Sequence, residues 1–352
     1  MADQKARRAV VSVKYNGANI DTMLEEYLNS ITYTDPAEGE GDDLTLNIND
    51  RDHKWIGPWF PEKGDTLSAM IKLKFWQGKN DKQKFQCGDF VLDDFSFSGE
   101  PVKLSIKAVS IPADSCFKKT KHTQTYEETT VSSIAGEIAG RAGVSLNYDA
   151  DDIDVERIEQ SEQDDCSFLQ TLAKRYGLVY KLYRNRIVLF DEARYEAREP
   201  VFTITPKVIE PSWSWDTTFD QNYTGAVYEY THGDQNVTFH VTAGGGDRIL
   251  KINEAAGSLG EAERITVGQL NEANKAETTM DVTLTLANPS ITATSTVQVK
   301  GYGRLDGKYY VTKVSWSIGS GVRQKLSLRK VPERMSVESA WIEEPEQWTG
   351  GQ

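Results

Sequence analysis

Four histidines are the residues of this 352-residue sequence best suited to metal binding or to acid–base chemistry at neutral pH. They are His53, His122, His232 and His240. No two of them follow a metal-ligand spacing such as HxxxH. His232 and His240 could lie on paired strands of one hairpin, but two separate surface histidines are the simpler interpretation. The sequence therefore predicts no metal ligand and no histidine base.

Two pairs of adjacent carboxylates, Asp151-Asp152 and Asp164-Asp165, are the next candidates for chemistry. Catalytic carboxylates need environments that separate their pKa values, whereas neighbours in loops and at helix starts are usually solvated or cap the helix. Asp164-Asp165 directly precedes a predicted helix, so we expect it to cap that helix. Asp281, just before a predicted strand, carries no catalytic signal either.

The sequence also lacks the common nucleophile and phosphate motifs. It has no GxSxG motif and no SxxK motif in a suitable context. Gly244-Gly245-Gly246 resembles a phosphate loop only in glycine content, because no Lys-Ser/Thr follows it, and we interpret it as a turn. Trp213 and Trp215 could stack on sugars or bases, but they are more typical of barrel or interface contacts. We therefore predict a non-enzymatic protein with no catalytic, cofactor-binding or metal-binding residue.

Composition and charge narrow the class of protein further. A hydrophobic content of 38% with 10% aromatic residues is typical of globular domains. The net charge of -13 argues against a surface that binds duplex DNA, which needs clustered Lys and Arg. Cys87, Cys116 and Cys166 form no CxxC pair, which favours a reducing compartment. We expect no signal peptide and no membrane anchor, and therefore folding in a cytoplasm.

Residues 9–111 have the pattern of a small β-barrel. A run of valines precedes Asn16-Gly17, a turn typical of a β-hairpin. Apolar and polar residues alternate in the segments that follow, as in half-buried strands. These strand patterns lie at 10–15, 44–48, 69–76, 88–97 and 102–109. The acidic stretch from Asp35 to Asp43 is predicted to be a surface loop.

Between Thr129 and Gly143 the apolar spacing changes to that of a helix, with Thr129 or Thr130 as the cap. A second helix is predicted from about Asp165 to Tyr176, ended by Gly177. A short hairpin then follows at 178–183 and 187–190. These elements predict a compact α+β insert.

Strand patterns return from Val201 onward and are interrupted by a helix-prone stretch from Leu259 to about Glu277. After Pro332 the chain is acidic and has no apolar periodicity. We therefore predict an α+β fold that is mostly β, with two similar β-barrel-like domains. The expected ranges are a first barrel at 1–115, an α+β insert at 116–199, a second barrel at 200–335 with a helical excursion at about 244–280, and an acidic tail at 336–352.

Two sets of motifs, in this order and spacing, resemble the phage late control gene D proteins, the baseplate hub proteins of contractile tails. The first set lies in the insert and the second near the end of the chain. They comprise Glu159-Gln160, residues 164–169, Leu172-Ala173, the hairpin at 178–180 and 187–191, the Ala-rich stretch 262–276, residues 282–286, Asn288-Pro289, residues 307–311 and residues 326–328.

The resemblance implies a homotrimer in which each subunit supplies two similar barrels. The resulting ring would adapt the sixfold tail tube to the threefold central spike. It also implies contacts with a tube or tube-initiator protein, the spike and other baseplate proteins, and passage of the tape-measure protein and DNA through the lumen. The chain stops soon after the second barrel, so we expect the spike to be a separate chain. The implied location is the virion tail of a phage or of a phage-tail-like particle.

Symmetric assembly would also cover sheet edges, which independently favours a ring. The strands predicted to form it lie around Val10–Val13, Leu44–Ile48, Val282–Leu286 and Tyr309–Val314. The charge of -13 suggests the further hypothesis that an acidic inner wall repels DNA. Two alternatives stay open at this point: a tail-associated cell-wall hydrolase, and a carbohydrate- or receptor-binding tail protein.

Overall fold

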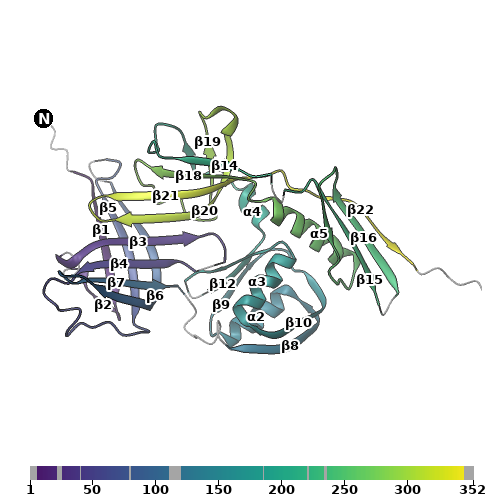
Figure 1. Ribbon diagram of the computed structural model, residues 1–352, viewed down its shortest axis with the longest axis horizontal. Helices are drawn as coiled ribbons and strands as arrows, with labels where there is room; N and C mark the ends of the chain where they lie inside the picture. The colour runs from purple at the N-terminus through teal and green to yellow at the C-terminus, as the bar shows by residue number, and fades with distance from the viewer. Residues whose placement is uncertain are drawn as a thin grey trace, which may run out of the picture.

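The computed structural model describes residues 6–21, 26–39, 41–78, 81–110, 120–184, 186–219, 222–233 and 236–344. The chain is mostly β with a compact α+β insert, which confirms the predicted fold class (Figure 1). The two β regions differ from the prediction in one respect: they do not close as separate barrels. Their strands join one 13-stranded sheet, because a strand of the first region pairs with a strand of the second.

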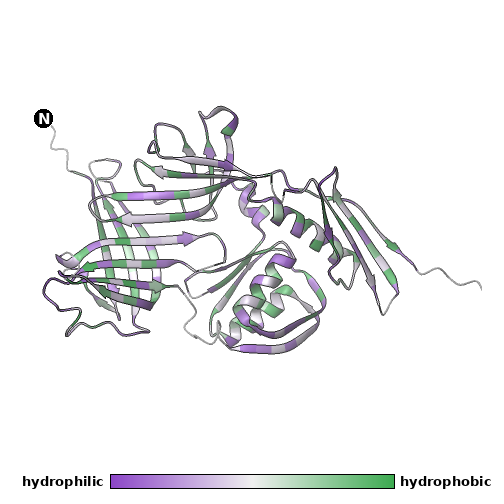
Figure 2. Cartoon of the chain, viewed as in Figure 1, coloured by the Kyte–Doolittle hydropathy of each residue, from purple (hydrophilic) through white to green (hydrophobic). Residues whose placement is uncertain are grey.

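The first β region supplies seven strands to this sheet. They are β1 (Arg8–Tyr15), β2 (Ala18–Asn19), β3 (Leu28–Pro36), β4 (Asp43–Asn49), β5 (Thr66–Lys74), β6 (Lys82–Ser98) and β7 (Lys103–Val109). The predicted hairpin turn is present, with Asn16 and Gly17 both at positive φ. Figure 2 shows the alternation of apolar and polar residues along the strands, and Leu44, Leu46 and Ile48 are buried as that alternation predicts.

The second β region repeats the strand order of the first. Its strands are β13 (Phe202–Ile204), β14 (Ser214–Thr217), β18 (Thr278–Leu284), β19 (Thr296–Val299), β20 (Gly307–Ile318) and β21 (Val322–Lys330), with a 3₁₀ turn, η2 (Gly303–Leu305), before β20. The pairing order is β3-β4-β7-β6-β5-β1 in the first region and β14-β18-β21-β20-β19-β13 in the second. The architecture is therefore duplicated, although the sequence has no detectable repeat.

The insert contains both predicted helices and the predicted hairpin. Its elements are β8 (Lys121–Thr130), α2 (Val131–Arg141), β9 (Ser145–Asp149), β10 (Asp154–Asp164), α3 (Asp165–Arg175), β11 (Val179–Leu182), β12 (Arg186–Phe190) and α4 (Glu192–Ala197). Thr130 caps α2 and Asp164 caps α3, each by accepting a hydrogen bond from a backbone N–H of the first turn. Gly177, at φ +66°, follows the end of α3, as the sequence predicts.

The helical excursion packs differently from the expectation. Strands β15 (Gly225–His232), β16 (Val237–Gly244), β17 (Ile249–Ile252) and β22 (Val337–Glu343) form a separate four-stranded sheet, and α5 (Leu259–Asn274) packs against it. Tyr228, Phe239 and Val241 share a core with the insert rather than with the large sheet. The close approach of α5 to the end of α3 needs two glycines, because a Cβ on Gly177 would lie 2.7 Å from the Cα of Gly268.

Strand β22 was not predicted, because its residues show no apolar alternation. It forms by pairing with β16, with Val241 opposite Ala340. The predicted domain boundaries at 115/116, 199/200 and 335/336 stay predictions. Within the described residues, no helix has the length and apolar character needed to cross a membrane.

Candidate assembly interface and buried junctions

The large sheet is open at β1 and β14, which lie near the two ends of its main run of strands, and at β13, which pairs only with β19; two open segments, on β6 and β14, carry exposed aromatic residues (Figure 1). Strand β6 pairs with β5 only up to Val91, and Asp94–Ser98 pair with β7 alone. Strand β14 pairs only with β18. Among the described residues, these two segments therefore present unpaired backbone groups on one side. Such edges are ready-made surfaces for pairing with another chain.

A cluster of phenylalanines lies beside the β6 edge. Phe60 is 52% exposed, and its ring stacks on that of Phe97 with the centroids 5.7 Å apart. The ring of Phe95 packs edge-on against the ring of Phe60, with the centroids 5.4 Å apart. Exposed Ile56 lies in the loop that carries Phe60. An exposed cluster of large apolar side chains is typical of an interaction surface.

The β14 edge also carries exposed apolar side chains. Trp213 is 39% exposed and packs edge-on against Tyr302, while the Trp215 indole N–H donates a hydrogen bond of 3.2 Å to the Tyr309 hydroxyl. Phe219, just beyond the strand, is 70% exposed. The two tryptophans predicted to anchor a barrel or an interface therefore stand at a free edge of the sheet.

Within one chain, the two β regions meet through a pair of antiparallel strands. The end of β20 runs antiparallel to β3, with Trp316 opposite Tyr33 and Ser315 opposite Thr34. Both aromatic rings are buried there, and the Thr34 and Ser315 hydroxyl groups lie within hydrogen-bond distance at 3.5 Å. This junction joins the two duplicated units.

The strands that the sequence suggested for ring formation are mostly paired within the chain. Leu44–Ile48, Val282–Leu286 and Tyr309–Val314 lie on β4, β18 and β20, each paired on both sides. Val10–Val13 lies on β1, which pairs with β5 on one side and with β2 only at Lys14 and Tyr15, so this segment is at an open edge. Alternation identifies a half-buried strand, but it does not show which strand ends the sheet, and the ring-forming strands stay a prediction.

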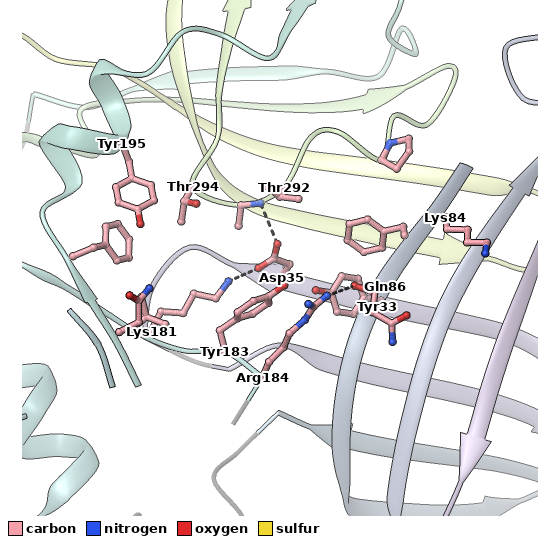
Figure 3. A pocket seen from close by; sticks show the side chains of 16 residues that line it. Tyr33, Asp35, Lys84, Gln86, Lys181, Tyr183, Arg184, Tyr195, Thr292 and Thr294 are labelled. Atoms are coloured by element: carbon pink, nitrogen blue, oxygen red, sulfur yellow. Dashed lines mark hydrogen bonds and ion pairs between the residues drawn. The ribbon is translucent and has the colours of Figure 1, made fainter. Parts of the chain in front are cut away.

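A buried charged cluster fixes the insert to the large sheet (Figure 3). The Lys181 ammonium on β11 forms an ion pair with Asp35 at the end of β3, and its Nζ lies 3.4 Å from the Asp42 carboxylate. The second oxygen of Asp35 accepts a hydrogen bond of 3.1 Å from the backbone N–H of Ala293, which precedes β19. The Tyr33 hydroxyl donates to Asp42 at 2.7 Å. Three parts of the chain therefore meet at one lysine.

This cluster has unusual electrostatics, because two carboxylates share one buried ammonium group. The pKa of Asp42 is raised to about 7, mainly because the carboxyl group is buried; Lys181 opposes the rise, and the nearby Asp35 charge adds to it. Lys181 and Asp35 also line a cavity of about 440 Å³, together with Tyr183 and Arg184. The prediction of a surface loop from Asp35 to Asp43 is wrong at both aspartates, because Lys181 is too distant in sequence to be recognised as their partner.

A second buried network joins α4 to the large sheet. The guanidinium of Arg329 on β21 contacts Glu192 at 2.8 Å and Glu196 at 2.5 Å. Arg334 reaches Glu196 at 2.7 Å, so two cations face two carboxylates. The ring of Tyr310 lies 4.5 Å below the Arg329 guanidinium. Balanced charges of this kind hold the packed elements in position.

The four histidines are spread over the molecule and have different neighbours. His53 lies 3.9 Å from Glu100, and His122 lies 3.9 Å from Asp165. On the β15–β16 hairpin, His240 is opposite Glu229 and not opposite His232. The part of the chain that the structure describes contains no cluster of three or more His, Cys, Asp or Glu side chains placed to hold a metal.

The adjacent carboxylates have structural partners. Asp152 accepts from the backbone N–H and hydroxyl of Ser132 at the start of α2, and Asp151 pairs with Arg194. Asp164 caps α3 as predicted. Asp165, by contrast, is buried and accepts from Arg141 at 2.8 Å and from Gln160 at 2.9 Å, so it forms an ion pair rather than a cap.

The remaining predicted features lie apart from one another. Asp281 accepts from Ser327 at 2.6 Å and pairs with Lys325. The three glycines at 244–246 form the turn between β16 and β17. Cys87 and Cys166 are buried, with the Cys166 sulfur 3.4 Å from the Tyr180 hydroxyl oxygen, and Cys116 lies outside the described residues.

Comparisons with known proteins agree with the sequence resemblance. No family model matches the chain. It is 30% identical over 179 residues to a probable baseplate hub protein of Escherichia phage 186, covering 49% of this chain and 42% of that protein. The corresponding protein of Escherichia phage P2 is 31% identical over 164 residues, covering 45% and 39%. The matches thus span about two fifths of the length of these curated relatives.

One solved structure extends the likeness to the whole fold. The 43 kDa tail protein of prophage MuSo2 from Shewanella oneidensis has a TM-score of 0.68 and 13% identity, covering 92% of this chain and 98% of that one. At this identity the likeness concerns the fold alone. The resemblance to the late control gene D family is therefore confirmed: the chain is similar in sequence to phage baseplate hub proteins over about half its length and shares its fold with a phage tail protein over nearly all of it.

Proposed function

We propose that this chain is a structural hub subunit of a contractile tail baseplate, and that three copies form a ring. The observation that carries the proposal is the duplication of the sheet unit within one chain, joined through β20 and β3 and open at β6 and β14. Three copies joined at these edges would present six similar units around one axis. Such a ring has threefold symmetry with a sixfold repeat of its sheet units.

This geometry suits an adaptor between a sixfold and a threefold partner. The six sheet units would face the tail tube or a tube-initiator protein, and the threefold arrangement of whole subunits would face the central spike. The insert and the four-stranded sheet, which lie to one side of the large sheet in Figure 1, would contact other baseplate proteins. The location that follows is the tail of a phage or phage-tail-like particle, assembled in the host cytoplasm.

The face of the large sheet opposite the core would line the lumen. On β3, β4, β14, β18 and the end of β6, its side chains are mostly serine, threonine and asparagine. The other strands add mainly basic side chains at their polar positions, such as Lys72, Lys74, Lys107 and Lys325. The polar positions of this face are therefore not predominantly acidic, which argues against the hypothesis of an acidic wall. A hydroxyl-rich surface of mixed charge would let the tape-measure protein and DNA pass without specific binding.

A structural role also agrees with the partners found for the candidate catalytic residues. Each aspartate of the two adjacent pairs caps a helix or forms an ion pair. The alternative of a cell-wall hydrolase is tested by a peptidoglycan-clearing assay with the purified chain, for which we expect no clearing.

Electron microscopy of the purified chain tests the proposal. The expected particle is a ring with a central hole and six similar units in the end-on view. A compact particle without a hole, or a ring with another number of units, would contradict it.

A further inference from the structure

Four strands of each sheet unit correspond residue by residue, and not only in strand order: β3, β4, β7 and β6 in the first, and β14, β18, β21 and β20 in the second. In the first unit, the β6–β7 ladder has a bulge between Leu92 and Asp94. In the second unit, the β20–β21 ladder has a bulge at the same place, between Val311 and Lys313. A bulge fixes the register of the strands around it, so the two ladders can be superposed without ambiguity.

Superposition of the ladders pairs each residue of one unit with a residue of the other. Phe97, five residues beyond Leu92 on β6, takes the place of Trp316, five residues beyond Val311 on β20. The paired residues can be followed further from strand to strand, through β7 and β4 to β3 in the first unit and through β21 and β18 to β14 in the second. Trp215 on β14 corresponds in this way to Tyr33 on β3. The free edges are thus the counterparts of the two strands that meet inside the chain.

We propose that residues 95–98 of β6 pair antiparallel with residues 214–217 of β14 in a neighbouring copy, with Phe97 opposite Trp215 and Ser96 opposite Asp216. This inference rests on the proposed ring and adds its register. It follows from the internal junction, where the counterparts of these pairs are Trp316 opposite Tyr33 and Ser315 opposite Thr34.

The side chains at the two edges suit this pairing. On the core side, Phe97 and Trp215 are only half-buried in one chain, whereas Trp316 and Tyr33 are buried in the internal junction. Cross-strand aromatic pairs stabilise antiparallel sheets. On the polar side, the Ser96 hydroxyl would donate to the Asp216 carboxylate, where the internal junction has the hydroxyls of Ser315 and Thr34.

The edge chemistry also explains why the occupant is a second copy of this chain. The β6 edge and the β14 edge are different surfaces, so each copy would use both, one toward each neighbour. A contact of this kind is heterologous and closes into a ring when the rotation per copy divides the circle. The exposed rings of Phe60 and Trp213 flank the two edges and would be covered by the same contact.

Cysteine pairs on the polar side of the two strands test the register. Opposite residues of antiparallel strands have Cα atoms about 4.5–5.5 Å apart, within the range of a disulfide, whereas positions two residues out of register are about 7–8 Å apart. We expect S96C/D216C and S98C/S214C to form covalent dimers and trimers under mild oxidation. The matched pairs S96C/S214C and S98C/D216C use the same four positions and should form at least tenfold less product. The wild-type chain controls for its three own cysteines.

The outcomes separate the register from the ring. Cross-linking of the in-register pairs alone supports the proposal. Trimers in solution together with cross-linking of the out-of-register pairs, or of neither set, would overturn the register and leave the ring standing. A chain that stays monomeric at high concentration and cross-links with no pair would contradict both.

Discussion

The two hydrophobic cores of this molecule are built in different ways. The core of the large sheet draws on residues from Val13 to Leu328, so both ends of the chain contribute to it. The core of the insert and the four-stranded sheet draws mainly on residues 126–270. The first is a continuous scaffold made by backbone pairing of two units, whereas the second is a module held to that scaffold by buried ion pairs. Scaffold and module can therefore be perturbed separately.

Truncation of one aromatic ring in each core gives the largest expected effects. Trp316→Ala and Phe168→Ala each remove a fully packed ring, and we expect each to lower the free energy of unfolding by about 3–5 kcal/mol. Thermal melting of both variants measures this. Only Trp316→Ala should also disturb the junction of β20 with β3. A melt of Phe168→Ala identical to wild type would show that the insert has no core of its own.

Loss of the shared lysine should loosen the module from the scaffold. Lys181→Met keeps the length of the side chain but leaves Asp35 and Asp42 buried without a cation, and we expect a cost of about 3–5 kcal/mol. Urea denaturation of the variant measures it. Lys84→Met, an exposed residue at the same cavity, is the matched control and should change stability by less than about 0.5 kcal/mol. Equal effects of the two substitutions would refute the role of the cluster.

The same cluster predicts a pH dependence of stability. The pKa of Asp42 is raised to about 7 in the folded chain, so at pH values between the pKa of this group in the unfolded chain and 7 the folded chain binds a proton that the unfolded chain has lost. The stability that this protonation contributes is fully present below about pH 4 and is lost as the pH rises through 7. We expect the free energy of unfolding to fall by about 2–4 kcal/mol between pH 5 and pH 8.5.

Asp42→Asn isolates this carboxyl group from the others. The amide imitates the protonated acid, so the variant should show a flatter pH profile over the same range, measured by urea denaturation at each pH. The titratable groups near Asp42 are Tyr33, Asp35, Lys181, Cys87 and Tyr183, and they are unchanged in the variant. An unaltered slope would mean that another group titrates.

Removal of the end of the chain after Pro332 should have the smallest effect on the scaffold. It deletes β22, which pairs with β16, and Met335, whose backbone N–H donates to Asn271 at 2.9 Å. It also removes the partly exposed Arg334, but Arg329 still contacts both Glu192 and Glu196. We expect the large sheet to stay folded and the module to lose about 1–2 kcal/mol. Amide hydrogen exchange should show lost protection on β16 and unchanged protection on β3 and β20. Loss of soluble protein would show that β22 supports the whole fold.

The sequence predicted those features that depend on local patterns. Helix α3 was expected because its cap, apolar spacing and terminal glycine lie within 14 residues. The alternation at Leu44, Leu46 and Ile48 likewise identified a strand. Pairing partners distant in the chain, such as β20 with β3, leave no local signal, so the sequence could not show which strands end the sheet.

The candidate site was predictable only in part, for the same reason. Trp213 and Trp215 were predicted as barrel or interface anchors by residue type, but their place at a sheet edge depends on strand order. Lys181 and its two aspartates were missed because the ion pairs span about 140 residues of chain, as between Lys181 and Asp35. Strand β22 was missed because it is an exposed edge strand whose apolar and polar residues do not alternate.

The mass of the purified chain in solution tests the central claim most directly. Light scattering or native mass spectrometry should give three times the 39.4 kDa of one chain, and disruption of the β6 edge by Phe97→Asp should shift the species toward the monomer. A single chain at every concentration, or a stable assembly of two or four copies, would contradict a threefold ring.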